Sequence, residues 1–256
     1  SIVATPTVVY VGGAFTLVNA LTVRNRLAAF PPTSNTPTTW NPNANGTVRT
    51  IVLSGTDVFF GGDFTQVSLT ARNHIALVNA SGVLQSWSRD LDGDVHCLTM
   101  ANNVLYAGGD LTLVDGKGRQ RLVAFGVPGS GLPTITDWSP ATENTVMSIA
   151  AQGGALFVGG VFGLVGTGAN LLSSPGAAKW TGTDWAAIGS GNQLNNSSIN
   201  VGNIGNTTVA SSARSEADQF VGTLTQQYQQ LDQVRKQEHS LKMQAAGMGL
   251  YAPPYV

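Results

Sequence analysis

The stretch Val58-Phe-Phe-Gly-Gly-Asp-Phe64 decides the fold, because the chain contains four versions of it. The other three are Val9-Tyr-Val-Gly-Gly-Ala-Phe15, Leu105-Tyr-Ala-Gly-Gly-Asp-Leu111 and Leu156-Phe-Val-Gly-Gly-Val-Phe162. The first glycines of the four pairs are separated by 49, 47 and 51 residues. Four tryptophans follow nearly the same spacing, with steps of 47, 51 and 47 residues: Trp40, Trp87, Trp138 and Trp185. A shared period of about 50 residues is typical of propellers and solenoids.

Each repeat contains four short runs of apolar and β-branched residues separated by turn signals. In the second repeat these runs are 48–54, 58–60, 74–79 and 83–87, and a polar loop is expected at 68–73. Four short antiparallel strands in about 50 residues predict one propeller blade. We therefore expect a mainly β protein, a propeller closed by four blades or a four-blade arc of a larger one. The blades are predicted at about 1–46, 47–93, 94–144 and 145–190.

Several finer expectations concern the strands and their markers. The outermost, fourth strand of each blade is predicted at 38–40, 83–87, 135–138 and 184–188. Glycines inside a strand allow a bend or the close approach of a neighbouring chain, so Gly61, Gly108 and Gly159 are expected at equivalent points of consecutive sheets. Trp40, Trp87 and Trp138 are expected to pack against the next blade at the ends of the outer strands.

The repeats also resemble a known family. The segment 59–77, together with Asn41-Pro-Asn-Ala-Asn-Gly-Thr-Val48, is similar to the delta-60 repeats of bacterial and phage propeller-like proteins. The fourth repeat departs towards a related form at 178–191, and the resemblance covers about residues 1–191. It implies a propeller fold used as a scaffold or binding platform, and it implies no single function.

Composition narrows the classes of partner. Charged residues make up 11% of the 256 residues and the net charge is −1, so general binding to nucleic acid or to a membrane surface is not expected. No segment has the roughly 18 consecutive apolar residues of a membrane span. The single cysteine, Cys97, lies between apolar neighbours and is predicted to be a buried small residue. Because Ser1-Ile-Val-Ala4 matches Thr50-Ile-Val-Leu53, the sequence starts part-way through the first strand of a repeat. Either an initiator Met was removed or the sequence is the tail end of a longer chain, and we favour the second interpretation.

Candidate chemistry is sparse. Asp90, Asp92 and Asp94 alternate in Asp90-Leu-Asp-Gly-Asp94 and are weak candidates for a cation site, with an inter-blade turn as the preferred interpretation. His74, His96 and His239 are scattered and have no cysteine or paired carboxylate partners for a zinc site. No nucleophile motif is present. We expect no cofactor, no metal and no catalytic activity.

The last part of the chain differs in character. Residues 191–214 form an Asn/Ser/Gly-rich linker, and 215–256 are predicted to be a helical anchor and tail, with the helix at 215–246. Its apolar stripe supplies the predicted partner-binding residues, which are Phe220, Leu224, Tyr228, Leu231, Val234 and Leu241. The helix either folds back on the propeller or docks onto another chain, and we favour docking through residues 210–256.

These observations favour a non-enzymatic structural or adhesion component of a larger assembly, most similar to a phage virion or tail appendage protein and located in the virion. The propeller would act as an interaction platform and the helix as the docking or oligomerisation element. The alternative is a secreted or cell-surface bacterial propeller that binds glycans through exposed aromatic residues on one rim. A propeller enzyme with its site in the central channel is a third hypothesis.

Overall fold

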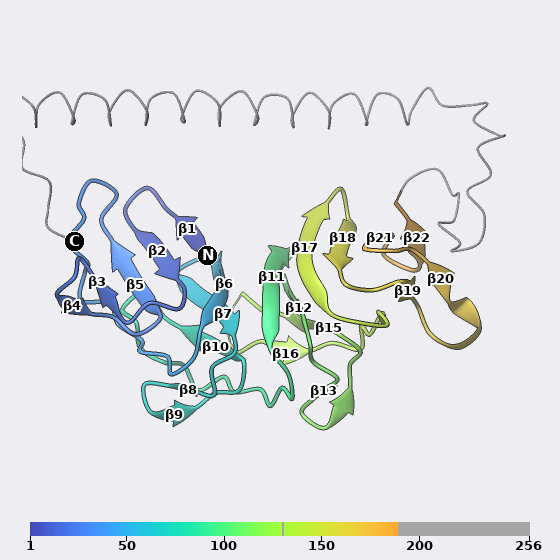
Figure 1. Ribbon diagram of the computed structural model, residues 1–256, viewed down its shortest axis with the longest axis horizontal. Coiled ribbons are helices and arrows are strands. Elements are labelled where there is room, and N and C mark those ends of the chain that lie inside the picture. Colours follow the sequence, from blue (N-terminus) through green and yellow to red (C-terminus); the bar gives the residue numbers. More distant parts are fainter. Residues whose placement is uncertain (130, 189–256) are drawn as a thin grey trace, which may run out of the picture. The chain divides into compact units, whose positions relative to one another are not determined.

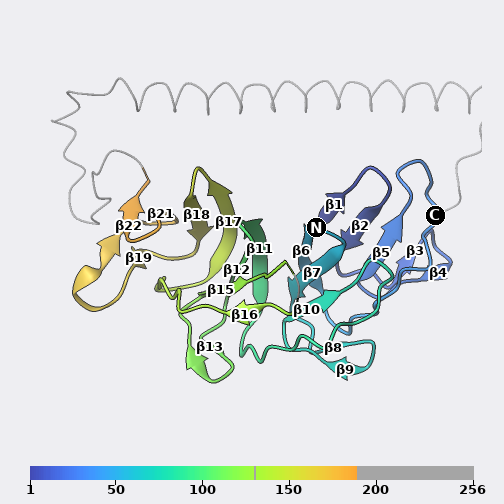
Figure 2. The same ribbon diagram turned by 180° about the vertical axis from the view of Figure 1, so that it is seen from behind.

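The computed structural model describes residues 1–129 and 131–188, which all belong to the compact unit Ser1–Asn196. This part is almost entirely antiparallel β-structure, and its one helical element is the short 3-10 turn η1 (Gly168–Asn170). Four main sheets follow one another in chain order in Figures 1 and 2, from the blue first sheet to the orange fourth sheet. The prediction of a mainly β protein is confirmed.

Each main sheet is built from one repeat, and its strands pair in the order in which they occur. The first sheet contains β1 (Ile2–Ala4), β2 (Val9–Gly12) and β5 (Leu27–Phe30). The second contains β6 (Val48–Ser54), β7 (Asp57–Gly62) and β10 (Ile75–Val78). The third contains β11 (Val95–Ala101), β12 (Val104–Gly109), β15 (Leu122–Gly126) and β16 (Thr134–Ile135). The fourth contains β17 (Val146–Gln152), β18 (Ala155–Gly160), β21 (Ala177–Trp180) and β22 (Trp185–Ala187).

A two-stranded ribbon extends from every sheet between its second and third strands. The ribbons are β3–β4 (Leu17–Val18, Thr22–Val23), β8–β9 (Gln66–Val67, Thr70–Ala71), β13–β14 (Leu113–Val114, Lys117–Gly118) and β19–β20 (Leu164–Val165, Leu172–Ser173). The polar loop predicted at 68–73 was therefore wrong, because β9 lies within it. Ser68 and Leu69 have φ values of 48° and 63°, the paired positive values of a tight hairpin turn. Neither residue is the glycine that usually marks such a turn.

The predicted fourth strands form in only two sheets. β16 and β22 pair with the third and fourth sheets, whereas the segments 38–40 and 83–87 are not strands. Their backbones contact the sheets through isolated bonds, from Thr38 N to Ala29 O (2.8 Å) and from Gln85 N to Leu77 O (2.9 Å). In the second repeat the Asn79 side chain accepts the N–H groups of Ser81 and Val83, and such local bonds compete with strand pairing.

In the second, third and fourth repeats, the second glycine of the pair faces a bulge in the first strand. The pairing register of β6 with β7 shifts between Val48 and Thr50, and the same shift occurs in the third and fourth sheets. A Cβ atom on Gly62 would collide with the carbonyl oxygen of Thr47 on the bulged strand. The equivalent Gly109 and Gly160 face the same collision, so glycine is required here for space.

In the first three repeats, the first glycine of the pair receives a valine from the next sheet. A Cβ on Gly61 would lie 2.5 Å from Val95 Cγ1, and one on Gly108 would lie 2.6 Å from Val146 Cγ1. Gly61, Gly108 and Gly159 pair with Thr50, Cys97 and Ser148 in the same register, which confirms that they are equivalent points. The close approach of sheets thus explains the first glycine, and the bulge explains the second.

Adjacent sheets pack mainly through their first strands, since β6 contacts β11 and β11 contacts β17. These contacts bury the core, in which Phe59, Phe60 and Phe64 are fully covered. The four antiparallel sheets are compatible with propeller blades, and a closed ring is not seen among the described residues. Among those same residues no helix has the length and apolar character needed to cross a membrane. The predicted helix at 215–246 lies outside them.

Candidate functional site

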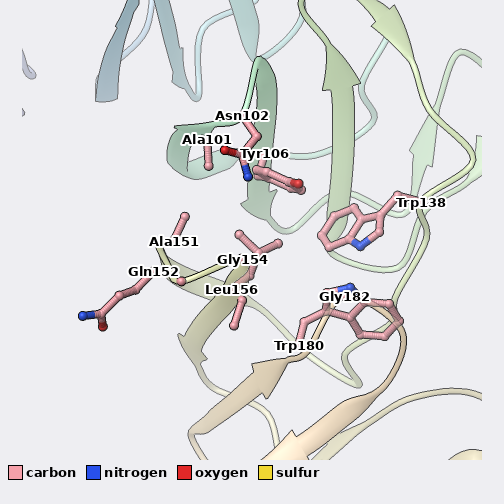
Figure 3. A pocket seen from close by; sticks show the side chains of 12 residues that line it. Ala101, Asn102, Tyr106, Trp138, Ala151, Gln152, Gly154, Leu156, Trp180 and Gly182 are labelled. Carbon is pink, nitrogen blue, oxygen red and sulfur yellow. The ribbon is translucent and has the colours of Figure 1, made fainter.

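A cleft lined by aromatic side chains lies between the third and fourth sheets. Tyr106 comes from β12, Trp138 follows β16, and Trp180 ends β21, so three elements supply the rings (Figure 3). The Tyr106 and Trp138 centroids are 5.1 Å apart at 77°, and those of Trp138 and Trp180 are 6.3 Å apart at 87°. The pocket has a volume of about 280 Å³, with the amide side chains of Asn102 and Gln152 also lining it. We call this pocket the aromatic cleft.

The contact between the second and third sheets is formed by residues at the same positions of the repeat, but here their side chains fill the space between the sheets. Trp87, the counterpart of Trp138, packs edge-on against Phe59 and Phe125 at 5.6 and 5.3 Å. Its Nε1 donates to the carbonyl oxygen of Pro133 at 2.8 Å, and only 2% of the residue is exposed. Trp40 and Trp87 are buried against the next sheet as predicted, but neither ends an outer strand, because 38–40 and 83–87 are not strands. Trp138 is only half-buried.

The hairpin of the fourth sheet helps to leave the cleft open. Gly153 and Gly154 form its turn with φ values of 58° and 79°, and a Cβ on either would meet nothing within 4 Å. Both line the aromatic cleft, together with the small residues Ala151 and Ala155. The small residues of this hairpin therefore leave open the space that forms the aromatic cleft.

A second pocket of about 680 Å³ lies beside Trp138 and Trp180 and is also lined by Trp185. The Trp180 and Trp185 rings meet edge-on at 5.5 Å. Among the described residues nothing accepts a hydrogen bond from Trp185 Nε1, although this nitrogen is buried. The carboxylates of Asp137 and Asp184 also line this pocket. Flat aromatic faces next to hydrogen-bonding groups suit a ligand that has both apolar and hydroxyl surfaces.

A row of charged groups follows the first strands of the second and third sheets. Arg49 Nη2 lies 3.2 Å from Asp63 Oδ2 and 3.8 Å from Asp94 Oδ2, and His74 Nδ1 lies 3.2 Å from Asp94 Oδ1. The next pair is His96 Nε2 with Asp110 Oδ2, at 2.8 Å. These groups pair with one another, although Asp63 Oδ1 is buried without a hydrogen-bond partner among the described residues. The sequence spacing of the two histidines did not reveal this pairing.

Asp110 is the carboxylate of this row with a perturbed pKa. Partial burial raises its pKa, but hydrogen bonds from Thr145 and His96 and the charges of His96 and Arg121 outweigh burial. The pKa of Asp110 therefore lies below its ordinary value, and the carboxylate is ionised at neutral pH.

The three aspartates proposed as weak cation ligands have separate partners. Asp90 Oδ1 accepts from Asn73 Nδ2 at 2.9 Å, and Asp92 Oδ1 accepts from the backbone N–H groups of Thr112 and Leu113 at 2.7 and 2.8 Å. Burial raises the pKa of Asp92, but hydrogen bonds from the Thr112 hydroxyl and these backbone donors lower it by more, so the pKa lies below its ordinary value. Asp94 belongs to the charged row. No group of three metal-ligating side chains occurs within residues 1–129 and 131–188.

Cys97 is buried as predicted, in the position that Thr50 occupies in the second sheet. Burial raises the pKa of the Cys97 thiol to about 12, so it stays protonated at neutral pH. The predicted partner-binding residues, from Phe220 to Leu241, lie outside the described part of the chain. Sequence reasoning missed the aromatic cleft, because Tyr106 and Trp180 had been interpreted only as strand residues.

Comparisons with known proteins identify no family for this chain. No protein-family model and no curated protein matches this sequence. Among solved structures, the chain is similar to a crystal structure of the computationally designed Ika8 protein, with a TM-score of 0.44 and 13% sequence identity. The match covers 72% of this chain and spans 58% of the Ika8 chain. The resemblance to delta-60 repeats stays a prediction.

Proposed function

We propose that the protein is a non-enzymatic structural or adhesion component of a larger assembly, most similar to a phage virion or tail appendage protein. The observation that carries the proposal is that the surface joining each sheet to the next is repeated on the fourth sheet and is not covered there by described residues. Ser148, at the position of the buried Thr50, is exposed. A surface already used for stacking inside the chain is a suitable surface for joining further protein.

The assembly proposal also keeps the docking role of residues 210–256. Deleting residues 211–256 should leave folded sheets, because the contacts between them lie within residues 1–188. We expect the full chain to form larger complexes than the truncated chain, as measured by light scattering coupled to size-exclusion chromatography. Equal masses together with unchanged partner binding would contradict the docking role of this segment.

The second candidate function is glycan binding by a secreted or cell-surface propeller, and the aromatic cleft favours it. Sugar rings present C–H faces that pack on aromatic rings and hydroxyls that bond to amides and carboxylates. Trp180 lines both pockets, so it is the residue to remove. Trp180→Ala should abolish retention on a glycan array, whereas Phe157→Ala, on the same sheet but lining neither pocket, should not. Absence of glycan binding by the unaltered chain would exclude this candidate.

A further inference from the structure

Each contact between adjacent sheets has a receiving half and an inserting half. The receiving half includes the first glycine of a pair and the side chain opposite it on the first strand, as in Gly61 and Thr50. The inserting half is the first strand of the next sheet, whose Val95 fills the space above Gly61. Thr50 Oγ1 accepts the N–H of Leu98 on that strand at 3.1 Å.

The same contact joins the first two sheets. Ser1 Oγ accepts the N–H of Ile51 at 3.1 Å, and Val48 and Ile51 both lie against Gly12. At the contact between the third and fourth sheets, Val146 and Ile149 lie against Gly108. One pattern therefore recurs at all three internal contacts, always with the later sheet inserting into the earlier one.

The fourth sheet carries a receiving half that no described residue covers. Among the described residues, a Cβ on Gly159 would meet only Ser148 Oγ at 2.6 Å and the carbonyl oxygen of Gly176 at 3.7 Å, both from the same repeat. Ser148 is exposed, whereas the equivalent Thr50 and Cys97 are each only 8% exposed.

The flanking positions of the fourth sheet are apolar. Met147 and Val161 occupy the places of Arg49 and Asp63, and they are 50% and 66% exposed. The charged row of the second and third sheets therefore does not continue onto this sheet. We call Met147, Ser148, Gly159 and Val161 the terminal face.

The first sheet carries an uncovered inserting half. Ile2 pairs with Val11 in the register in which Ile51 pairs with Phe60, so Ile2 and Ile51 are equivalent. Ile51 and the equivalent Leu98 are 5% and 7% exposed, but Ile2 is 71% exposed. Ile2 is therefore an exposed apolar side chain at the inserting position of the first sheet.

We propose that the terminal face of one copy receives β1 of a second copy, so that Ile2 of the second copy lies against Gly159 and its N–H donates to Ser148 Oγ. Strand contacts run between successive sheets, and the first and fourth sheets stand at opposite ends of the row in Figures 1 and 2. Among the described residues the first sheet does not reach the terminal face of its own chain, so the inserting half there would come from a second copy. The contact is head-to-tail, which gives a ring if the rotation closes and a filament if it does not.

This inference rests on the proposed assembly function and names the partner. The test joins the two halves covalently in the full chain carrying Cys97→Ser, which removes the native thiol. Two proteins, one with Ile2→Cys and one with Ser148→Cys, are mixed and oxidised. Both positions are exposed, so neither substitution disturbs the core. A disulfide requires Cα atoms within about 7 Å, and the equivalent Thr50 and Leu98 are in direct contact.

We expect the mixture to give a cross-linked product of twice the chain mass on a non-reducing gel. Each single variant alone should give none, because a head-to-tail contact does not bring two equivalent positions together. The matched control replaces Ser148→Cys by Leu69→Cys, on the tip of the β8–β9 ribbon, which is 87% exposed but lies outside both halves. Adding excess unaltered protein should reduce the product, because its inserting and receiving halves compete with those of the two cysteine variants.

Three results would overturn the inference. Equal product from the control mixture would mean random collision. A chain carrying both Ile2→Cys and Ser148→Cys that forms only an internal disulfide would mean that the first sheet closes onto its own fourth sheet. A full chain that forms complexes on light scattering but shows no Ile2–Ser148 cross-link would refute this contact while leaving the assembly function in place.

Discussion

The contact between the second and third sheets and the contact between the third and fourth sheets use the same sequence positions and pack differently. In the first, Trp87 is enclosed by Phe59 and Phe125 and bonded to Pro133. In the second, Trp138 borders an open cleft with Tyr106 and Trp180. A repeat motif thus specifies where sheets meet, whereas the side chains outside the motif decide whether the contact is solid or hollow.

The same lesson applies to the first glycines. Gly108 is covered by Val146, and the equivalent Gly159 has no covering residue from another sheet among those described. Identical letters in the sequence can therefore be a packing requirement in one sheet and a free surface in the next. The predictions below test this difference.

The largest difference is expected between the two tryptophans. Trp87→Ala removes a fully enclosed ring and its hydrogen bond, and it should lower the free energy of unfolding by about 3–5 kcal/mol. Trp138→Ala should cost less than half as much, because its ring already borders open space. Urea unfolding followed by circular dichroism measures both. Equal losses would mean that the cleft closes in solution.

The next largest difference concerns the glycines. Gly108→Val would press against Val146 and Ile149 and should lower the free energy of unfolding by about 1–3 kcal/mol. Gly159→Val would meet only the Ser148 hydroxyl, which can rotate away, so its loss should be clearly smaller. The same urea unfolding experiment compares the two variants. A greater loss for Gly159→Val would show that the terminal face is covered within the chain.

A pH effect should distinguish the charged row from the apolar terminal face. Because the folded-state pKa of Asp110 is lowered, the unfolded state binds more protons in acid. The stabilisation is present above the unfolded pKa of about 4 and is lost as the pH falls through the lower folded pKa. Asp110→Asn should therefore destabilise the protein at pH 7 and flatten the acid limb of a plot of melting temperature against pH. An unchanged acid limb would contradict the assigned pKa direction.

The smallest expected effect on stability is at the cysteine, and here the readout is reactivity. Cys97 is buried with a pKa raised to about 12, so a maleimide should label it at least about tenfold more slowly than an exposed thiol. The comparison protein is Cys97→Ser with Ser148→Cys, which moves the thiol to the equivalent position of the fourth sheet. Fast labelling of both proteins in the folded state would contradict the difference in burial.

Much of the fold was predictable from the sequence because the repeats carry redundant markers. The paired glycines and the period of about 50 residues located the strand pairs, and the strand predicted at 48–54 has the observed bounds of β6. The ribbon at β8–β9 was missed because Ser68 and Leu69 adopt positive φ values without a glycine. The outer strands of the first two sheets were overpredicted, because local side-chain bonds such as those of Asn79 compete with pairing.

The candidate sites depended on tertiary structure to a greater extent. Local sequence specifies backbone geometry, so the need for glycine opposite the bulge and the burial of Cys97 follow from short patterns. The aromatic cleft requires Tyr106, Trp138 and Trp180, which are far apart in the chain and meet only when the third and fourth sheets pack. At the terminal face, Gly159 has the same sequence motif as Gly61 and Gly108, and only the structure shows that no described residue of another sheet covers it. The burial of a residue depends on neighbouring residues that the whole fold brings to it. A repeated motif therefore does not by itself show whether another sheet covers it.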